Sequence, residues 1–275
     1  MSSIIFITAV IIVFVVRYKR GIRQGYGIAL RSIGPLRSKL ISLPDPYRKL
    51  LIDYFPYYNK LSEGDKAKFE RKLCLILFTK VFIPRNFENV TDEMKVLISA
   101  SAVQLTFGLD EVYLAHFKKI LVYPNDYYSS ITKRYHKGEV NPAYGIIVIS
   151  WHTFVMGYLN PTGEGINLGL HEMAHALRLE NIIRNEEYQF FDERLLKRLD
   201  EFGRKVCENS ESQAVRFLRP YACTNQHEFF AVAIENFFER PVGLQQAMPE
   251  LFAILTTLLN QNPISLDTTS KDQAA

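Results

Sequence analysis

The fold is decided by residues 165–179, which read GINLGLHEMAHALRL. Apolar residues surround this segment on nearly every face, a pattern typical of a helix buried in a protein core. His171, Glu172 and His175 form an H-E-x-x-H sequence inside it. Burying two imidazoles and a carboxylate is costly unless they are paired or bind a metal. Because residues i and i+4 share one helix face, the sequence predicts a buried helix that carries a metal site.

The spacing of this motif predicts zinc chemistry. His171 and His175 are expected to bind Zn²⁺, and Glu172 beside them is expected to act as general base toward the water that attacks a carbonyl group. A catalytic zinc takes three protein ligands. No histidine continues the pattern, because residues 178–181 read Arg-Leu-Glu-Asn. We therefore expect the third ligand to be a carboxylate distant in the sequence.

Candidates for this ligand lie in residues 221–241, which read YACTNQHEFFAVAIENFFERP. The segment predicts a helix over about 225–238 and offers Glu228, Glu235 and Glu239. Glu228 and Glu235 are seven residues apart, so they lie on the same helix face. Spacing alone leaves the choice between them open. Apolar neighbours surround both, so at least one buried acid needs a cationic partner.

The flanking sequence predicts an α+β fold. Ser62 and Thr91 are expected to cap two helices of a mostly helical part over 45–110. The β-branched segments 118–124 and 144–150 predict short strands of a small mixed sheet. The second of these is either a plain core strand or an edge strand that pairs with an extended peptide. Segment 241–249 is expected to connect to a last helix that begins at Pro249.

The N-terminus carries the most apolar run of the chain. Residues 4–16 read IIFITAVIIVFVV, and a helix over 1–20 with interfacial Arg17 and Lys19 is long enough for a bilayer core about 30 Å thick. The alternative is a helix packed on the protein's own body. Seven basic and no acidic residues follow in 17–39. By the positive-inside rule, we expect a single N-terminal anchor in the membrane with the body in the cytoplasm.

Charge outside this segment is nearly balanced. The chain of 275 residues has a net charge of +4. Residues 17–39 hold seven of its 33 basic residues and no acidic residue, which leaves 26 basic against 29 acidic residues in the rest of the chain. The basicity therefore belongs to a short connector, and no nucleic-acid-binding pattern is present, so nucleic acid is not an expected partner. Three widely spaced cysteines make a disulfide unexpected, and we interpret Cys223 as a small buried residue.

The domain organisation expected from these patterns has four parts. An anchor helix over 1–20 and a basic connector over 21–44 precede a single catalytic unit over 45–263. Within that unit, a helical part over 45–110 precedes a catalytic part over 111–263. A polar tail over 264–275 closes the chain.

Four segments resemble the Mlc titration factor A family of zinc-dependent peptidases. They are TDEMKVLISASAVQL, ILVYP, the HEMAHAL helix and YACTNQHEFFAVAIENFFERP, and the similarity runs from about Tyr57 to Pro263. The last segment is also similar to the catalytic domain of anthrax lethal factor, in which a tyrosine precedes the zinc-ligand glutamate by seven residues. Tyr221 and Glu228 match that spacing. This sequence departs from the family in its apolar N-terminus and in RLENIIRNEEYQ after the motif.

The resemblance implies a zincin-like metallopeptidase domain with zinc ligands His171, His175 and Glu228. It implies that Glu172 is the base, that Tyr221 stabilises the oxyanion, and that Glu235 supports the ligands from behind. Two alternatives remain: Glu235 as the ligand, and Tyr221 as a merely packed aromatic residue.

The function implied is a zinc metallopeptidase with a peptide substrate and aminopeptidase-like action on short peptides. The other hypothesis is a regulatory binding protein that sequesters a transcriptional regulator or another partner, with a structural zinc site. The family's repressor partner is not carried over, because no interaction motif for it is visible.

Overall fold

Four helices, two of them capped by side chains, build the first described part of the chain. The structure is a computed structural model that describes residues 42–110, 112–129, 133–159, 165–183, 189–208 and 212–266. Ser62 accepts a hydrogen bond from the Asp65 amide, and Thr91 accepts one from the Met94 amide, as the cap prediction requires. The helices of this part are α4 (Asp45–Tyr54), α5 (Pro56–Asn59), α6 (Glu63–Thr79) and α7 (Asp92–Thr106).

The chain also forms a small mixed sheet, whose first strand lies between α6 and α7 in the sequence. Its strands are β1 (Val81–Pro84), β2 (Lys119–Tyr123), β5 (Gly138–Asn141) and β6 (Ile146–Ser150), in the order β1-β2-β6-β5. Strands β1, β2 and β6 are parallel, and β5 runs antiparallel to β6 with Gly138 opposite Ile149. A separate hairpin, β3 (Tyr127–Ser129) and β4 (Arg134–His136), precedes β5.

The remaining elements are nearly all helical. They are α8 (Trp151–Leu159), α9 (Leu168–Ile183), α10 (Glu193–Glu208), α11 (Gln213–Leu218), the 3₁₀ turn η2 (Pro220–Cys223), α12 (Gln226–Glu239), α13 (Pro241–Ala247) and α14 (Pro249–Leu259). Pro249 opens α14, as predicted. Residues 241–247 form a helix of their own and not the expected connecting segment.

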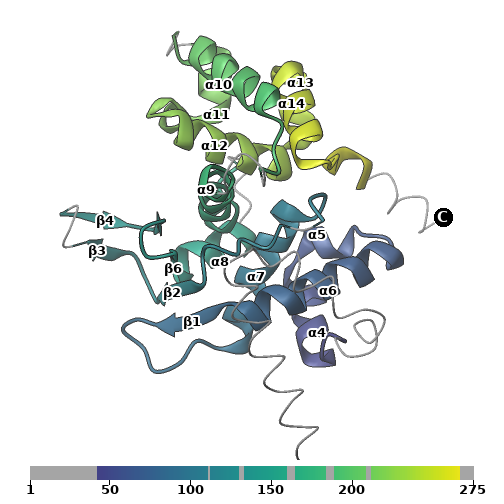
Figure 1. Ribbon diagram of the computed structural model, residues 1–275, viewed down its shortest axis with the longest axis vertical. Helices are drawn as coiled ribbons and strands as arrows, with labels where there is room; N and C mark the ends of the chain where they lie inside the picture. The colour runs from purple at the N-terminus through teal and green to yellow at the C-terminus, as the bar shows by residue number, and fades with distance from the viewer. Residues whose placement is uncertain are drawn as a thin grey trace, which may run out of the picture. The chain divides into compact units, whose positions relative to one another are not determined.

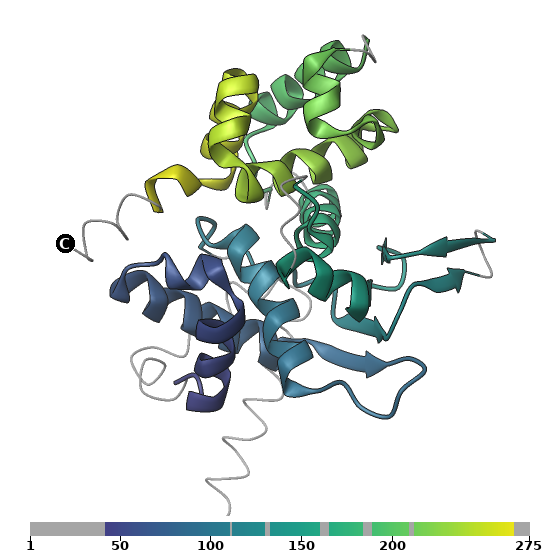
Figure 2. The same ribbon diagram turned by 180° about the vertical axis from the view of Figure 1, so that it is seen from behind.

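Helix α9 occupies the centre of the fold. It packs against α7 and the β5–β6 end of the sheet, while α12 packs on it from the side of the C-terminal helices (Figures 1 and 2). Most of its side chains are buried, including Met173, Ala174 and Leu177. The segment GINLGLHEMAHALRL is therefore a core helix, as its apolar pattern predicts.

The α+β class and the small mixed sheet are confirmed. The proposed edge role of segment 144–150 is wrong, because β6 is hydrogen-bonded on both sides, to β2 and to β5. Among the described strands, β5 occupies that edge of the sheet. The described residues from Leu43 onward form one compact unit, and the four-part division of the chain stays a prediction.

The predicted membrane anchor and membrane localisation are contradicted. A spanning helix needs about 20 apolar residues. The longest helix in the described ranges, α6, has 17 residues and a sequence rich in charge, and no described helix combines the length and apolar character that a bilayer requires. The stretch 1–20, on which the anchor prediction rests, lies outside the described residues.

Candidate metal centre

Helix α9 presents its two histidines to one point. The Nε2 atoms of His171 and His175 lie 3.1 Å apart, one helical turn from each other. The entry of the helix is fixed by Asn167, whose side-chain oxygen accepts a hydrogen bond of 3.0 Å from the Leu170 amide. This contact closes the first turn of α9, so the position of His171 follows from the cap.

Glu228 completes the arrangement from the first turn of α12. Asn225 caps that helix by accepting hydrogen bonds from the His227 and Glu228 amides. The Glu228 Oε2 atom lies 3.2 Å from His171 Nε2 and 3.4 Å from His175 Nε2. Residues more than 50 positions apart in the sequence thus bring two nitrogens and one oxygen together, as the predicted third ligand requires.

The three atoms have the spacing of metal ligands. A tetrahedral zinc with bonds of about 2.0–2.1 Å needs ligand atoms about 3.3 Å apart, and the observed edges are 3.1, 3.2 and 3.4 Å. Glu228 Oε2 is buried and has no well-aligned hydrogen-bond partner in the described structure. An unsatisfied buried carboxylate oxygen is unfavourable, and a cation at this point would satisfy it. The donor set therefore fits zinc.

Electrostatics at this point favour an ionised carboxylate. Burial alone raises the pKa of Glu228, but His171 and His175 outweigh it and hold this pKa well below its usual range. Burial lowers the pKa of His171, but the nearby carboxylates of Glu228 and Glu235 outweigh it and raise the pKa to about 10. In the metal-free protein, a proton on His171 therefore balances the surrounding acids and must leave when a metal binds.

Glu235 lies behind His171 and not beside the Nε2 atoms. Its Oε1 atom is 2.8 Å from His171 Nδ1 and 2.9 Å from the Arg219 guanidinium, and its Oε2 atom accepts a hydrogen bond of 2.6 Å from the Asn167 amide. A carboxylate bonded to the remote nitrogen of a ligand histidine fixes the tautomer and orientation of the ring. The geometry thus separates the two glutamates that helix spacing could not. Glu239, the third acid of α12, accepts a hydrogen bond from the Asn167 side chain.

Glu172 is buried against the sheet. Only 5% of its surface is exposed, and burial raises the pKa of its carboxyl group. A Cβ atom at Gly138 on strand β5 would lie 2.3 Å from Glu172 Oε1. Any larger residue at position 138 would therefore displace the carboxylate, which places the predicted base directly beside the β5 edge.

Tyr221 lies on the open side of the cluster. It belongs to η2, its ring centre is 6.0 Å from that of His171, and half of its surface is exposed. Burial of its hydroxyl, followed by the charge of Glu228, raises the pKa of Tyr221 to about 12. The hydroxyl therefore keeps its proton over the neutral range and can act as a hydrogen-bond donor.

A disulfide fixes the turn that carries Tyr221. Cys223, two residues further on, is bonded to Cys207 at the end of α10. The expectation that the cysteines are unpaired is therefore wrong. An odd number of cysteines in the sequence leaves one free, here Cys74, but says nothing against a bond between the other two.

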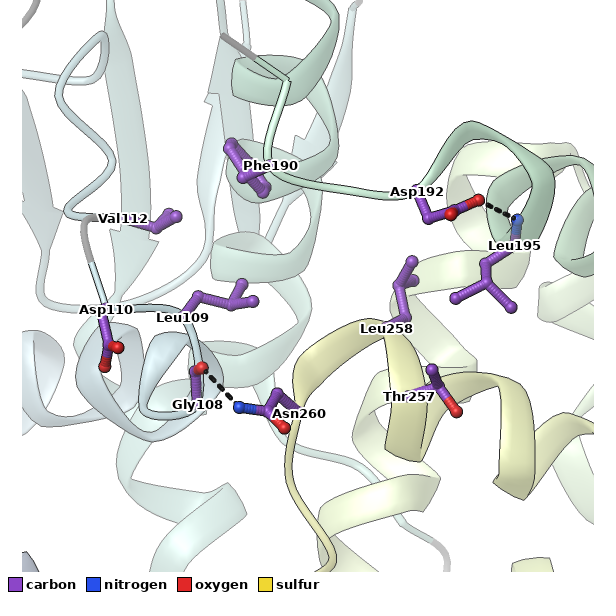
Figure 3. Close-up of a pocket in the computed structure, with 10 residues that line it drawn as sticks. All are labelled: Gly108, Leu109, Asp110, Val112, Phe190, Asp192, Leu195, Thr257, Leu258 and Asn260. Carbon is purple, nitrogen blue, oxygen red and sulfur yellow. Dashed lines mark hydrogen bonds between the residues drawn. The ribbon is translucent and has the colours of Figure 1, made fainter.

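A separate cavity lies away from these residues. It has a volume of about 590 Å³ and opens where the ends of α7 and α14 meet the start of α10 (Figure 3). Asp192, which lines the cavity, accepts a hydrogen bond from the Leu195 amide, and the Asn260 side chain donates a hydrogen bond to the Gly108 carbonyl. These polar groups serve packing within the protein, and the cavity contains none of the predicted site residues.

Three residues of the site were missed in the sequence. Asn167 and Arg219 contact Glu235 across long stretches of chain, and Gly138 makes room for Glu172. The buried Glu235 did signal the need for a cationic partner, but nothing local identifies Arg219 as that partner.

A family model that matches this chain covers the whole cluster. The family model described as glucose-regulated metallo-peptidase M90 matches residues 36–259. Over 232 residues the chain is 28% identical to an uncharacterized protein of Synechocystis sp., a match that covers 78% of this chain and 82% of that protein. It is 24% identical over 230 residues to the Mlc titration factor A of Pectobacterium atrosepticum, a match that covers 76% of this chain and 84% of the relative.

Proposed function

The chain belongs to the glucose-regulated metallopeptidase family M90, as its motifs indicate, and from this premise we propose that it is a zinc-dependent hydrolase of peptide bonds. The proposed ligands are His171, His175 and Glu228. One observation carries this proposal: two imidazole nitrogens and a carboxylate oxygen without a hydrogen bond form a triangle with edges of 3.1–3.4 Å. Zinc held there would supply a Lewis acid for the peptide carbonyl and the attacking water.

The proton transfers are assigned to Glu172. Its raised pKa suits a carboxylate that takes a proton from water and passes it to the leaving amine. The side chain is buried and lies directly against Gly138 of β5. Glu172 is therefore the proposed general base of a zincin-like site.

Tyr221 is the proposed donor to the oxyanion. A neutral hydroxyl supplies a hydrogen bond to negative charge without itself being charged, and the pKa of about 12 keeps that proton in place. The half-exposed position of Tyr221 lets a substrate reach it.

The substrate is proposed to be a peptide in extended form. Strand β5 pairs only with β6 among the described strands, so its other edge offers backbone groups next to Glu172. A peptide that adds to this edge would bring its carbonyl toward the base and the metal ligands. Aminopeptidase-like action on short peptides is part of the proposal, and peptides with free and acetylated N-termini would distinguish it from endopeptidase action.

Glu172→Gln tests the proposed activity. The amide keeps the size of the side chain but accepts no proton, so we expect peptide hydrolysis to fall by about 10²–10⁴ in kcat while zinc stays bound. Glu193→Gln, at an exposed glutamate in the first turn of α10, is the matched control. Unchanged hydrolysis by the zinc-loaded Glu172→Gln protein would contradict the assignment.

A second function is favoured by one relative. The Pectobacterium protein bears the name Mlc titration factor A, and we infer from that name a role in binding a partner. A regulatory binding protein with a structural zinc would need the ligands but not Glu172. Zinc retained without any hydrolysis in the unmodified protein would favour this second function.

A further inference from the structure

Arg219 has a backbone conformation that side chains rarely adopt. Its φ is 81° and its ψ is 144°, between the end of α11 and the start of η2. This region is populated almost only by glycine, because the Cβ of any other residue is strained there. By contrast, Asn260 at the end of α14 has φ 50° and ψ 44°, the ordinary left-handed region. If only the turn mattered, glycine would serve better than arginine at position 219.

The Arg219 side chain connects this strained turn to the candidate metal centre. Its Nη2 atom donates to Glu235 Oε1 over 2.9 Å, and the same oxygen lies 2.8 Å from His171 Nδ1. The Glu235 side chain is only 2% exposed, so its charge is removed from water. One buried oxygen atom thus joins the guanidinium to a proposed zinc ligand.

The guanidinium supplies the cationic partner that Glu235 needs. When His171 is neutral, as a zinc ligand must be, its Nδ1–H donates a hydrogen bond but brings no charge. The Asn167 amide, which bonds the other oxygen, is also neutral. Of these three contacts, Arg219 alone is always charged. Removing it would leave a buried carboxylate without a counter-charge and free to turn.

We propose that Arg219 is a positioning residue of the zinc site, whose side chain holds Glu235 so that His171 directs its Nε2 atom at the metal. This inference rests on the proposed function, because it assigns a role toward the same zinc. It explains why a strained arginine stands where glycine would relax the chain. The Arg219 carbonyl oxygen also accepts a hydrogen bond from the Ala222 amide, so Arg219 begins the turn that carries Tyr221.

Arg219→Gly separates the side chain from the backbone. Glycine suits φ 81° better than arginine does, and this relief of backbone strain opposes the stability lost when the buried Glu235 carboxylate loses its counter-charge, so the metal-free protein is expected to stay folded. Zinc affinity, measured by competition with a chelator, is expected to fall 10–100-fold, as for other residues that support ligand histidines. The absorption spectrum of the Co²⁺-loaded protein is expected to change, because the His171 ring is no longer held.

Two further variants sharpen the result. Arg219→Lys keeps the charge and is expected to recover part of the lost zinc affinity. Asn86→Gly is the matched control, since Asn86 is an exposed non-glycine residue with φ 64° in the loop between β1 and α7. It is expected to leave zinc affinity and the cobalt spectrum unchanged. If Arg219→Gly fails to fold, Arg219→Gln carries the same test, because it keeps a polar side chain but no charge.

Wild-type zinc affinity and an unaltered cobalt spectrum in Arg219→Gly, or in Arg219→Gln if the glycine variant does not fold, would overturn the inference. That failure is distinguishable from failure of the proposed function. If the wild-type protein binds zinc and Glu172→Gln has lost hydrolysis, the function stands and only the role of Arg219 is refuted. If the wild-type protein binds no zinc, the function itself is refuted.

Discussion

The two ends of helix α9 bury polar side chains in opposite ways. Near its C-terminus, Glu180 accepts hydrogen bonds from the Ala115 and His116 amides, and Asn181 accepts two from residues 190 and 191. Near its N-terminus, the Nε2 atoms of His171 and His175 converge on a carboxylate oxygen that accepts no aligned hydrogen bond.

This difference distinguishes polar groups that stabilise the fold from polar groups that are arranged to bind a ligand. Glu180 and Asn181 tie loops to the helix, and each accepts hydrogen bonds from backbone amides. At the histidine end, the Nδ1 atom of His171 is paired with Glu235, whereas the Nε2 atoms of both histidines face the point where a cation would bind. Variants at the two ends should therefore affect different quantities.

The largest expected effect of the remaining variants concerns the histidine end. Tyr221→Phe removes one hydrogen-bond donor to the oxyanion and should lower kcat by about 10²–10³, with zinc content and the free energy of unfolding unchanged. Steady-state kinetics on a short peptide measure this. Tyr144→Phe, at an exposed tyrosine after β5, is the control. Equal kcat values for the two variants would show that Tyr221 only packs.

A smaller effect is expected from the disulfide that borders this end. Replacing Cys207 and Cys223 by serine opens a loop between residues 16 apart, which should lower the free energy of unfolding by about 3 kcal/mol. Because η2 loses its tether, kcat should also fall, while the zinc ligands stay in place. Urea unfolding and zinc content measure both. Cys74→Ser, at the free cysteine, should change neither, and a double variant as stable as the wild type would contradict this account.

The smallest effect is expected at the other end of α9. Glu180→Ala leaves two backbone amides without their carboxylate and should lower the free energy of unfolding by about 2 kcal/mol. Zinc affinity should not change, because Glu180 lies more than one helical turn beyond His175. Glu193→Ala, which breaks only an exposed ion pair, is the control. A large loss of zinc affinity in Glu180→Ala would remove the distinction between the two ends.

Local patterns in the sequence predicted the elements that carry the site. The apolar surround of H-E-x-x-H predicts a core helix, and the caps at Ser62 and Thr91 are contacts within four residues. Strands 119–123 and 146–150 followed from their β-branched residues. Such features depend on neighbours along the chain, so the sequence contains them directly.

The contacts between distant elements could not be predicted in this way. Glu228 and Glu235 share a helix face, and only the packing of α12 on α9 places one before and the other behind His171. Strand β5 reads GEVN and lacks the apolar alternation of a strand, so its edge position was missed. The pairing of Cys207 with Cys223 likewise depends on tertiary structure.

Zinc content after mild chelation tests the central claim most directly. We predict about one zinc per chain in the wild-type protein, none in Glu228→Ala, and zinc bound 10–100-fold more weakly in Glu235→Ala. Zinc retained by Glu228→Ala and lost by Glu235→Ala would contradict the account, because the front and rear carboxylates of His171 would then be exchanged.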